Sequence, residues 1–212
     1  MHMLNKKIAL CAALCFFYPH ATSENIGKTH FIIGVPQELL LQMQPNKKGG
    51  SSCHAYFSPD DNLQQVLCSY IDQEQEAIDI AIYSFTNKHI AEAIINAYDR
   101  GVTVRLVSDP SWLSDNYSKI HLLQTHGIPI YVYNVHYSKK KAPSRNIMHH
   151  KFIIFKKNKD GRSYLWTGSY NFTRAATLHN QENAIIINKN GTVRQFQAQF
   201  ERLLGRCRQF SS

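Results

Sequence analysis

The sequence has few cysteines and no closely spaced pair of them. It contains 5 cysteines among 212 residues and no Cys-x-x-Cys motif, so a structural zinc site of the finger or ribbon type has no support. No apolar run in the body of the chain approaches the ~18 residues of a membrane-spanning helix, which excludes a polytopic membrane protein. With only 10 glycines and 7 prolines, the chain is neither collagen-like nor of low complexity. The length and composition therefore predict one domain of ordinary size with a sizeable core.

The N-terminal 23 residues have the features of a secretory signal peptide. Lys6 and Lys7 precede an apolar run over residues 8–18, and small residues follow it as far as Ser23. We predict cleavage near Ser23 and export to the periplasm or out of the cell. The alternative is an uncleaved anchor, for which the apolar run is short. Cleavage removes two lysines and no acid, so +7 of the formal charge of +9 remains.

Residues 24–52 form an N-terminal extension and linker, and residues 53–212 form the predicted catalytic domain. The linker ends in a polar stretch rich in lysine, glycine and serine, which is typical of a connecting segment. Cys53, Cys68 and Cys207 remain after the leader is removed. A disulfide between Cys53 and Cys68 is compatible with export, and free thiols are an equally good interpretation.

Hydrophobic periodicity divides the first half of the domain into alternating strands and helices. Short β-prone apolar runs separate segments with helical spacing, and Thr86 or Asn87 supplies one N-cap. Because strands joined by a helical crossover pair in parallel, this half predicts parallel pairing. The predicted strands cover residues 55–57, 78–85, 102–107 and 128–133, and the predicted helices begin at 58–61, at 86–87 and near 116.

The second half predicts a hairpin, a further strand and a closing helix. Residues 151–155 and 163–166 are the arms of the hairpin, with Asp160-Gly161 at its turn. A strand over residues 182–187 follows. The predicted fold class is therefore α/β, with a mixed, mostly parallel β-sheet flanked by helices. The closing helix has apolar residues at helical spacing, namely Val193, Phe196, Phe200 and Leu203.

One ordered set of polar residues carries the chemistry. Side chains two apart on a strand share a face, so His149 and Lys151 point together while His150 faces the other way. Ser169 and Asn171 are also two apart and offer a hydroxyl and an amide. An imidazole among such donors suits a phosphodiester, because it can attack phosphorus while the donors stabilise the anionic oxygens. Glu182, eleven residues after Asn171, is placed to accept a hydrogen bond from the second ring nitrogen.

This set resembles the HKD motif of the phospholipase D superfamily. His149-x-Lys151 is followed by Gly168-Ser169-x-Asn171 and then by Glu182, as in that motif. The segments Tyr56-Phe-Ser-Pro59, Ile80-Ala-Ile-Tyr-Ser-Phe-Thr86 and Arg100-Gly-Val-Thr-Val-Arg105 are similar to the same family's N-terminal half. The resemblance spans about residues 53–205 and is strongest to single-motif members, the Nuc-type bacterial endonucleases and the mitochondrial phospholipase D-like proteins.

The resemblance implies a role for each matching residue. His149 would be the nucleophile in one subunit and the general acid in its mate, and Lys151 and Asn171 would bind the phosphate. Ser169 and Glu182 would support the histidine. No metal or other cofactor is implied. Since this chain has one motif, a homodimer is implied, with the two His149 side chains facing each other across a twofold axis.

The chain departs from the family pattern at one position. The pattern HxKxxxxD expects an aspartate where this chain has Lys156, and Asp160 lies four residues later in the predicted turn. In the family that aspartate is more a structural partner than a reacting group, so we expect activity to survive. A non-catalytic phosphate-binding protein is the alternative.

Basic residues bracket the motif and suggest a polyanionic substrate. They are expected to neutralise phosphates, as they do along a nucleic-acid backbone. We predict a sequence-nonspecific nuclease; a phospholipase D acting on phosphatidylcholine or cardiolipin is the alternative, since the same charges attract anionic lipid. Four other histidines (His54, His136, His150 and His179) match no metal-ligand spacing. The predicted substrate-binding residues are Lys139, Lys140, Lys141, Arg145, Lys156 and Lys157.

Overall fold

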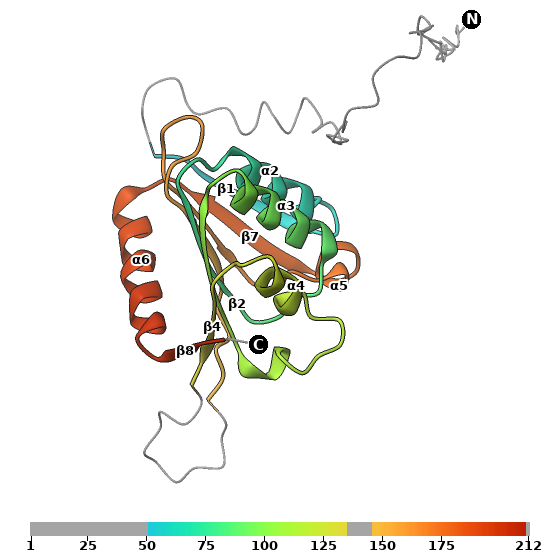
Figure 1. Cartoon of the computed structure of the whole chain (residues 1–212). Coiled ribbons are helices and arrows are strands. Elements are labelled where there is room, and N and C mark those ends of the chain that lie inside the picture. The colour runs from blue at the N-terminus through green and yellow to red at the C-terminus, as the bar shows by residue number, and fades with distance from the viewer. Residues whose placement is uncertain (1–50, 135–145, 211–212) are drawn as a thin grey trace, which may run out of the picture. The chain divides into compact units, whose positions relative to one another are not determined.

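A computed structural model of the chain describes residues 51–134 and 146–210, and eight strands in these ranges form one sheet in the order β1-β7-β6-β5-β2-β3-β4-β8 (Figure 1). The predicted signal peptide and nearly all of the linker lie outside these ranges. The strands are β1 (Cys53–Ser58), β2 (Ala77–Ile82), β3 (Thr103–Ser108), β4 (Ile130–Tyr133), β5 (Lys151–Phe155), β6 (Tyr164–Gly168), β7 (Glu182–Ile187) and β8 (Cys207–Gln209). The helices are α2 (Leu63–Gln73), α3 (Lys88–Asp99), the 3₁₀ turn η1 (Pro110–Trp112), α4 (Ile120–Thr125), α5 (Arg174–Leu178) and α6 (Asn190–Leu204).

The prediction of a mixed sheet flanked by helices is confirmed, but the prediction that it is mostly parallel is wrong. Only β2 with β3 and β3 with β4 pair in parallel. The other five pairings are antiparallel. The reason is that α3 and α4 join β2, β3 and β4, which are neighbours in the sheet, whereas α2 joins β2 to β1, which lies at the far edge beside β7. The second half turns back on itself through the β5–β6 hairpin, and β1 and β8 add to the two edges from outside the crossover unit.

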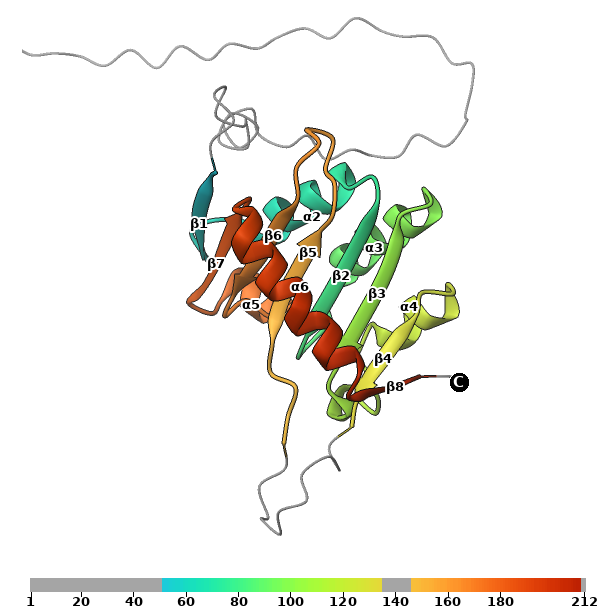
Figure 2. The ribbon, with the colours of Figure 1, turned by 90° about the vertical axis from the view of Figure 1, so that its left-hand side faces the viewer.

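The two faces of the sheet bury separate apolar clusters. One face is covered by α2, α3 and α4, and the other by α6, which runs across the strands (Figures 1 and 2). Alternation along β2 shows how this arises: Ile80 lies in the cluster beneath α2 and α3, whereas Ala81 lies in the cluster beneath α6. The closing helix packs as its spacing predicts, because Phe200 and Leu203 belong to the α6 cluster.

Local signals fix most helix boundaries. Of the two predicted caps for α3, Asn87 is the one used, since its Oδ1 accepts hydrogen bonds from the backbone of His89 (3.0 Å) and Ile90 (3.3 Å). The helix predicted near residue 116 begins later, at Ile120, because Asp115 folds the preceding residues into a turn by accepting from the Tyr117 amide at 2.8 Å. Short α5 and β8 were not predicted, as neither is long enough to show a period.

The cysteines and the lengths of the helices test two further predictions. Cys53, Cys68 and Cys207 are free thiols, so the alternative of a disulfide between Cys53 and Cys68 is wrong for this structure. In residues 51–134 and 146–210, no helix combines the length and apolar character needed to cross a bilayer.

A buried ion network ties the sheet to α6. The side chain of Asp79 is 2% exposed and receives two hydrogen bonds from Arg105, at 2.7 and 2.9 Å. Arg105 also pairs with Glu201 of α6 at 2.8 Å. Lys156 joins from the end of β5, bonding Gln197 and lying 3.7 Å from the Asp79 carboxylate. The residue that departs from the family pattern therefore has a structural partner of opposite charge.

We expect the exchange Asp79→Asn to lower the free energy of unfolding by about 3 kcal/mol, because it removes the buried carboxylate that Arg105 and Lys156 share. Glu201→Gln is the matched control, since Glu201 is half exposed at 52% and a surface pair contributes at most ~1 kcal/mol. Urea unfolding followed by circular dichroism measures both. Equal losses in the two variants would contradict the assignment of Asp79 as the centre of the network.

Candidate active site

The predicted site residues converge where several strands of the sheet begin or end, on the side to which the carboxyl ends of β2 and β3 point. The register pairs Ile82, the last residue of β2, with Lys151, the first residue of β5. It also pairs Gly168, the last residue of β6, with Ala184 near the start of β7. The carboxyl ends of β2, β3 and β6 therefore meet the amino ends of β5 and β7, as the strand directions in Figure 2 show. Segments more than 80 positions apart in the chain supply one cluster.

His149 and Lys151 point together, as predicted. The Lys151 Nζ lies 2.8 Å from His149 Nδ1 and 3.1 Å from Nε2, and it donates to the His149 carbonyl at 2.9 Å. The ring of Tyr83 packs against His149 with centroids 4.4 Å apart and the ring planes tilted by 58°, and the Lys151 Nζ lies 5.5 Å from the centroid of the Tyr83 ring. His150 turns to the opposite face and packs against Phe152. A cation and an aromatic ring therefore hold the imidazole from two sides.

A buried carboxylate anchors the chain just before His149. Asp109, at the end of β3, is 1% exposed. Its Oδ2 accepts the Met148 amide at 2.9 Å, and its Oδ1 accepts the amide and the hydroxyl of Ser111 at 3.0 and 2.6 Å. These bonds satisfy the carboxylate without a salt bridge. They fix the backbone that presents His149.

Ser169 and Glu182 form a second part of the cluster. The Ser169 Oγ donates to Glu182 Oε2 at 2.6 Å and accepts the Asn183 amide at 3.0 Å. The other carboxylate oxygen, Oε1, accepts from Asn180 at 3.1 Å. Ser169 and Asn180 occupy this carboxylate, and it makes no hydrogen bond to the His149 ring in the described part of the chain. The predicted bond from the ring to Glu182 is therefore wrong for this structure.

Asn171 presents its amide group with a defined orientation. Its Oδ1 accepts the backbone amide of Ser84 at 3.3 Å. The neighbouring Phe172 amide donates to the Ser84 carbonyl at 3.0 Å, which ties this turn to the end of β2. Because the oxygen is occupied, the Nδ2 hydrogens remain as donors. This is the group that a phosphate oxygen requires.

Gly168 is required by the close approach of β7. A Cβ at this position would lie 2.2 Å from the Asn183 carbonyl oxygen and 2.9 Å from the Ala184 Cα. The Ser169 amide then donates to the same Asn183 carbonyl at 3.1 Å. The glycine thus sets the position of the serine.

The structure does not bring all the predicted substrate-binding residues to this site. Lys156 lies five positions beyond Lys151 along β5, roughly 17 Å away at the rise of a strand, and it belongs to the Asp79 network. Lys157 follows it, and its backbone amide donates to Glu74 at 2.8 Å. Lys156 and Lys157 therefore lie a strand's length from His149, and their role in substrate binding stays a prediction. The other predicted residues, Lys139, Lys140, Lys141 and Arg145, lie outside the described residues.

Asp160 is a turn residue and does not replace the missing family aspartate. Its carboxylate accepts the Tyr164 hydroxyl at 2.6 Å and the Arg162 amide at 3.1 Å. These bonds close the loop between β5 and β6.

The surroundings favour a neutral imidazole at His149. Loss of hydration lowers the pKa of His149 below its ordinary value of 6.5, the Lys151 ammonium lowers it further, and Asp109 opposes both. Burial also lowers the pKa of Lys151, which is 8% exposed, while Glu182 raises it. The neutral imidazole is the form that attacks phosphorus. Among the described residues, no group of three His, Cys, Asp or Glu is placed to hold a metal ion.

Tyr83 and Asp109 were not predicted as parts of the site. Each directly follows a buried strand, Tyr83 after β2 and Asp109 after β3. Functional groups in open α/β sheets gather at the carboxyl ends of parallel strands, so the position of these two residues in the sequence was the available signal.

Comparison with known proteins gives the same family as the motif. Residues 67–204 match the family described as "Cardiolipin synthase, PLD-like domain". The chain is 37% identical over 131 residues to a phospholipase D of Rickettsia conorii, covering 62% of this chain and 58% of the relative. It is 28% identical to the mouse mitochondrial cardiolipin hydrolase, covering 78% and 69%. The chain thus spans less than two thirds of the rickettsial relative.

Solved structures of this fold are also similar. Nuc from Salmonella typhimurium, described as a phospholipase D family member, has a TM-score of 0.64 and 28% identity, covering 77% of this chain and 100% of its own. NucT from Helicobacter pylori has a TM-score of 0.69 and covers 76% and 100%. At 23% identity, NucT supports the fold alone.

We expect Gly168→Ala to destabilise the protein by about 1–3 kcal/mol, the usual cost of overpacking, because the added methyl group meets the backbone of β7. Gly191→Ala in α6 is the control: a Cβ there meets nothing within 4 Å, and a helical alanine is favoured over glycine. Urea unfolding compares the two. A Gly168→Ala variant as stable as wild type would show that β7 does not constrain this position.

We expect the pKa of His149 to move in opposite directions in two variants. Lys151→Met removes a positive neighbour and should raise this pKa, whereas Asp109→Asn removes a negative neighbour and should lower it. Titration of the His149 ring proton by NMR measures both shifts. Movement in the same direction in both variants would contradict the electrostatic account.

Proposed function

Because the chain belongs to the PLD-like domain family of cardiolipin synthase, we propose that it is a phosphodiesterase whose nucleophile is His149 and whose substrate is nucleic acid. The observation that carries this proposal is the position of the Lys151 Nζ, within 3.1 Å of both ring nitrogens of His149. A phosphate that meets the imidazole meets the ammonium at the same time. Export, predicted from residues 1–23, is part of the proposal.

The reaction is two displacements at phosphorus. A ring nitrogen of neutral His149 attacks phosphorus, a P–N bond forms, and the bond to the leaving oxygen breaks as that oxygen takes a proton from a general acid. Water then attacks phosphorus, gives a proton to the group that acted as acid, and the P–N bond breaks. The products are a free hydroxyl and a phosphomonoester, with His149 regenerated.

The described donors match the charge that develops during these steps. Lys151 and the Nδ2 group of Asn171 face the non-bridging oxygens, where negative charge builds in the transition state. Ser169, held by Glu182 and the Asn183 amide, supports this arrangement. These protein groups supply the electrostatic stabilisation in the proposed reaction, which therefore calls for no cation.

The general acid comes from a second copy of the chain. The sequence has one such motif, and one His149 cannot be nucleophile and acid in the same step. A twofold dimer that brings two His149 rings to one phosphate supplies both roles, since the same surface patch is used by each subunit.

The substrate proposal rests on charge. The chain has a formal net charge of +9, of which +7 remains once residues 1–23 are removed, and such an excess favours polyanions. A second candidate is phospholipid hydrolysis, favoured by the relatives named phospholipase D and mitochondrial cardiolipin hydrolase. Both substrates contain the phosphodiester that the cluster fits.

We expect the purified protein to release acid-soluble nucleotide from DNA in the presence of EDTA. His149→Asn should lose at least ~100-fold in rate, the contribution of a positioned acid or base. His126→Ala is the control, because His126 is exposed and lies between α4 and the amino end of β4, whereas the site lies at the carboxyl ends of β2 and β3. Quenching with labelled substrate in alkaline detergent, in which the P–N bond is stable, should trap a phosphohistidine in wild type only.

Two outcomes would contradict the proposal. Nuclease activity that survives in His149→Asn would remove the assigned nucleophile. Hydrolysis of cardiolipin vesicles under conditions that leave DNA intact would replace nucleic acid by phospholipid.

A further inference from the structure

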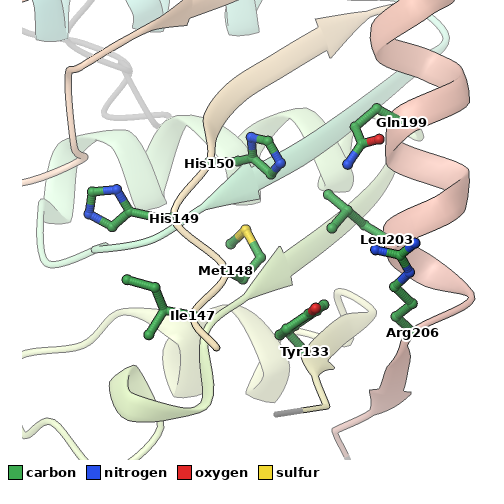
Figure 3. A pocket seen from close by; sticks show the side chains of 8 residues that line it. All are labelled: Tyr133, Ile147, Met148, His149, His150, Gln199, Leu203 and Arg206. Carbon is green, nitrogen blue, oxygen red and sulfur yellow. The ribbon is translucent and has the colours of Figure 1, made fainter. Parts of the chain in front are cut away.

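A cavity adjoins the motif on the side of the sheet covered by α6. Its volume is about 340 Å³, within the range of small-ligand sites. Figure 3 shows His150, Gln199, Leu203 and Arg206 around it, while His149 points away across the chain. His150 thus faces the cavity, whereas the ring of His149, whose residue also borders it, points to the other side of the chain, toward Lys151. The lining residues are Tyr133, Ile147, Met148, His149, His150, Gln199, Leu203 and Arg206.

The polar side chains that line the cavity are hydrogen-bond donors, and no carboxylate is among its lining residues in the described part of the chain. Arg202 donates to the Gln199 Oε1 through Nε (3.0 Å) and Nη2 (2.8 Å). With its oxygen occupied in this way, Gln199 directs its Nε2 group toward His150 (Figure 3). Arg206 is exposed and forms no ion pair with a carboxylate in residues 51–134 or 146–210. An amide, a guanidinium and an imidazole facing one space form a site for an anion.

The protonation state of the His150 imidazole suits reversible binding of an anion. Burial lowers the pKa of His150, and Lys151 and His149 lower it further. These neighbours therefore favour the neutral ring, which still offers one N–H. A bound phosphate would favour the protonated ring, which offers two.

The remaining lining suits an organic group attached to the anion. Leu203 and Met148 are buried and apolar. Tyr133, at the end of β4, adds an aromatic ring, and Ile147 is half exposed at 49%. Such surfaces pack against a sugar or a base. The cavity thus fits a nucleotide unit better than an isolated inorganic ion.

We propose that this cavity binds the phosphodiester next to the one that is cleaved, with Arg206, Gln199 and His150 as its ligands and Tyr133 beside the attached nucleoside. The inference rests on the proposed function. It adds that the protein binds two consecutive phosphates of the substrate. His149 separates the two positions, which places neighbouring phosphates of one strand on its two sides.

The test compares a thymidine dinucleotide, which has one phosphodiester, with the trinucleotide, which has two. Binding is measured by calorimetry in the full-length His149→Asn protein, with and without Arg206→Gln, so that no cleavage is needed. We expect Arg206→Gln to weaken trinucleotide binding about tenfold, the effect of one charged hydrogen bond, and to leave dinucleotide binding unchanged. The slope of log affinity against log salt for the trinucleotide should fall by about 0.7, the value for one phosphate contact on a single strand.

Two further variants sharpen the test. Arg194→Gln removes the same charge from α6 outside the cavity lining, and it should leave both affinities unchanged. Gln199→Leu keeps the net charge and the approximate size, and it should weaken trinucleotide binding with no change in the salt slope.

The outcomes are distinguishable. Equal loss for the dinucleotide and the trinucleotide in Arg206→Gln, or the same loss in Arg194→Gln, would overturn the second-phosphate site. A loss seen with cardiolipin vesicles and absent with the trinucleotide would assign the cavity to a lipid phosphate and overturn the nucleic-acid assignment. Failure of the wild type to cleave the trinucleotide would count against the proposed function, whereas the binding comparison would still decide the site.

Discussion

The antiparallel pairing of β5 with β2 is the contact on which the candidate active site depends. It joins a parallel βαβ half, in which functional groups lie after the strands, to an antiparallel half, in which His149 and Lys151 lie at the start of a strand. Without this reversal, the imidazole and the ends of β2 and β3 would lie at opposite edges of the sheet. The register then sets the detail: pairing of Ile82 with Lys151 brings Tyr83 onto the His149 ring. A shift of one residue would turn Lys151 to the α6 face.

The cluster is stabilised by groups that do not react. An ammonium and an imidazole in contact repel each other when both are charged, and the structure offsets this through neighbouring carboxylates. Asp109 acts through the backbone of Met148, and Glu182 acts through Ser169. Neither carboxylate forms a salt bridge with Lys151 among the described residues. The ammonium beside the imidazole is therefore available to an anion such as a phosphate.

The sequence was informative about elements and less so about their pairing. Periodicity and caps located β2, α3, β5 and α6, and the period of two along β5 separated His149 and Lys151 from His150. Sheet direction was harder, because the strand–helix–strand pattern of the first half was extended to a second half that contains a hairpin. The site could be predicted only where residues share a motif. Asp109 lies 39 positions from its partner Met148, and no local pattern reports a hydrogen bond across that distance. Lys156 illustrates the same point, because it is close to His149 in the chain while the extended strand β5 separates the two residues in space.

The opposite charges of Lys156 and Asp79 have a consequence for exchanging segments among relatives. A grafted motif that carries the family's aspartate at position 156 would set two carboxylates against each other beneath α6. Such a chimera would need a compensating change on β2, the strand that pairs with β5. Positions 79 and 156 are therefore best treated as a single inherited unit when parts of these proteins are recombined.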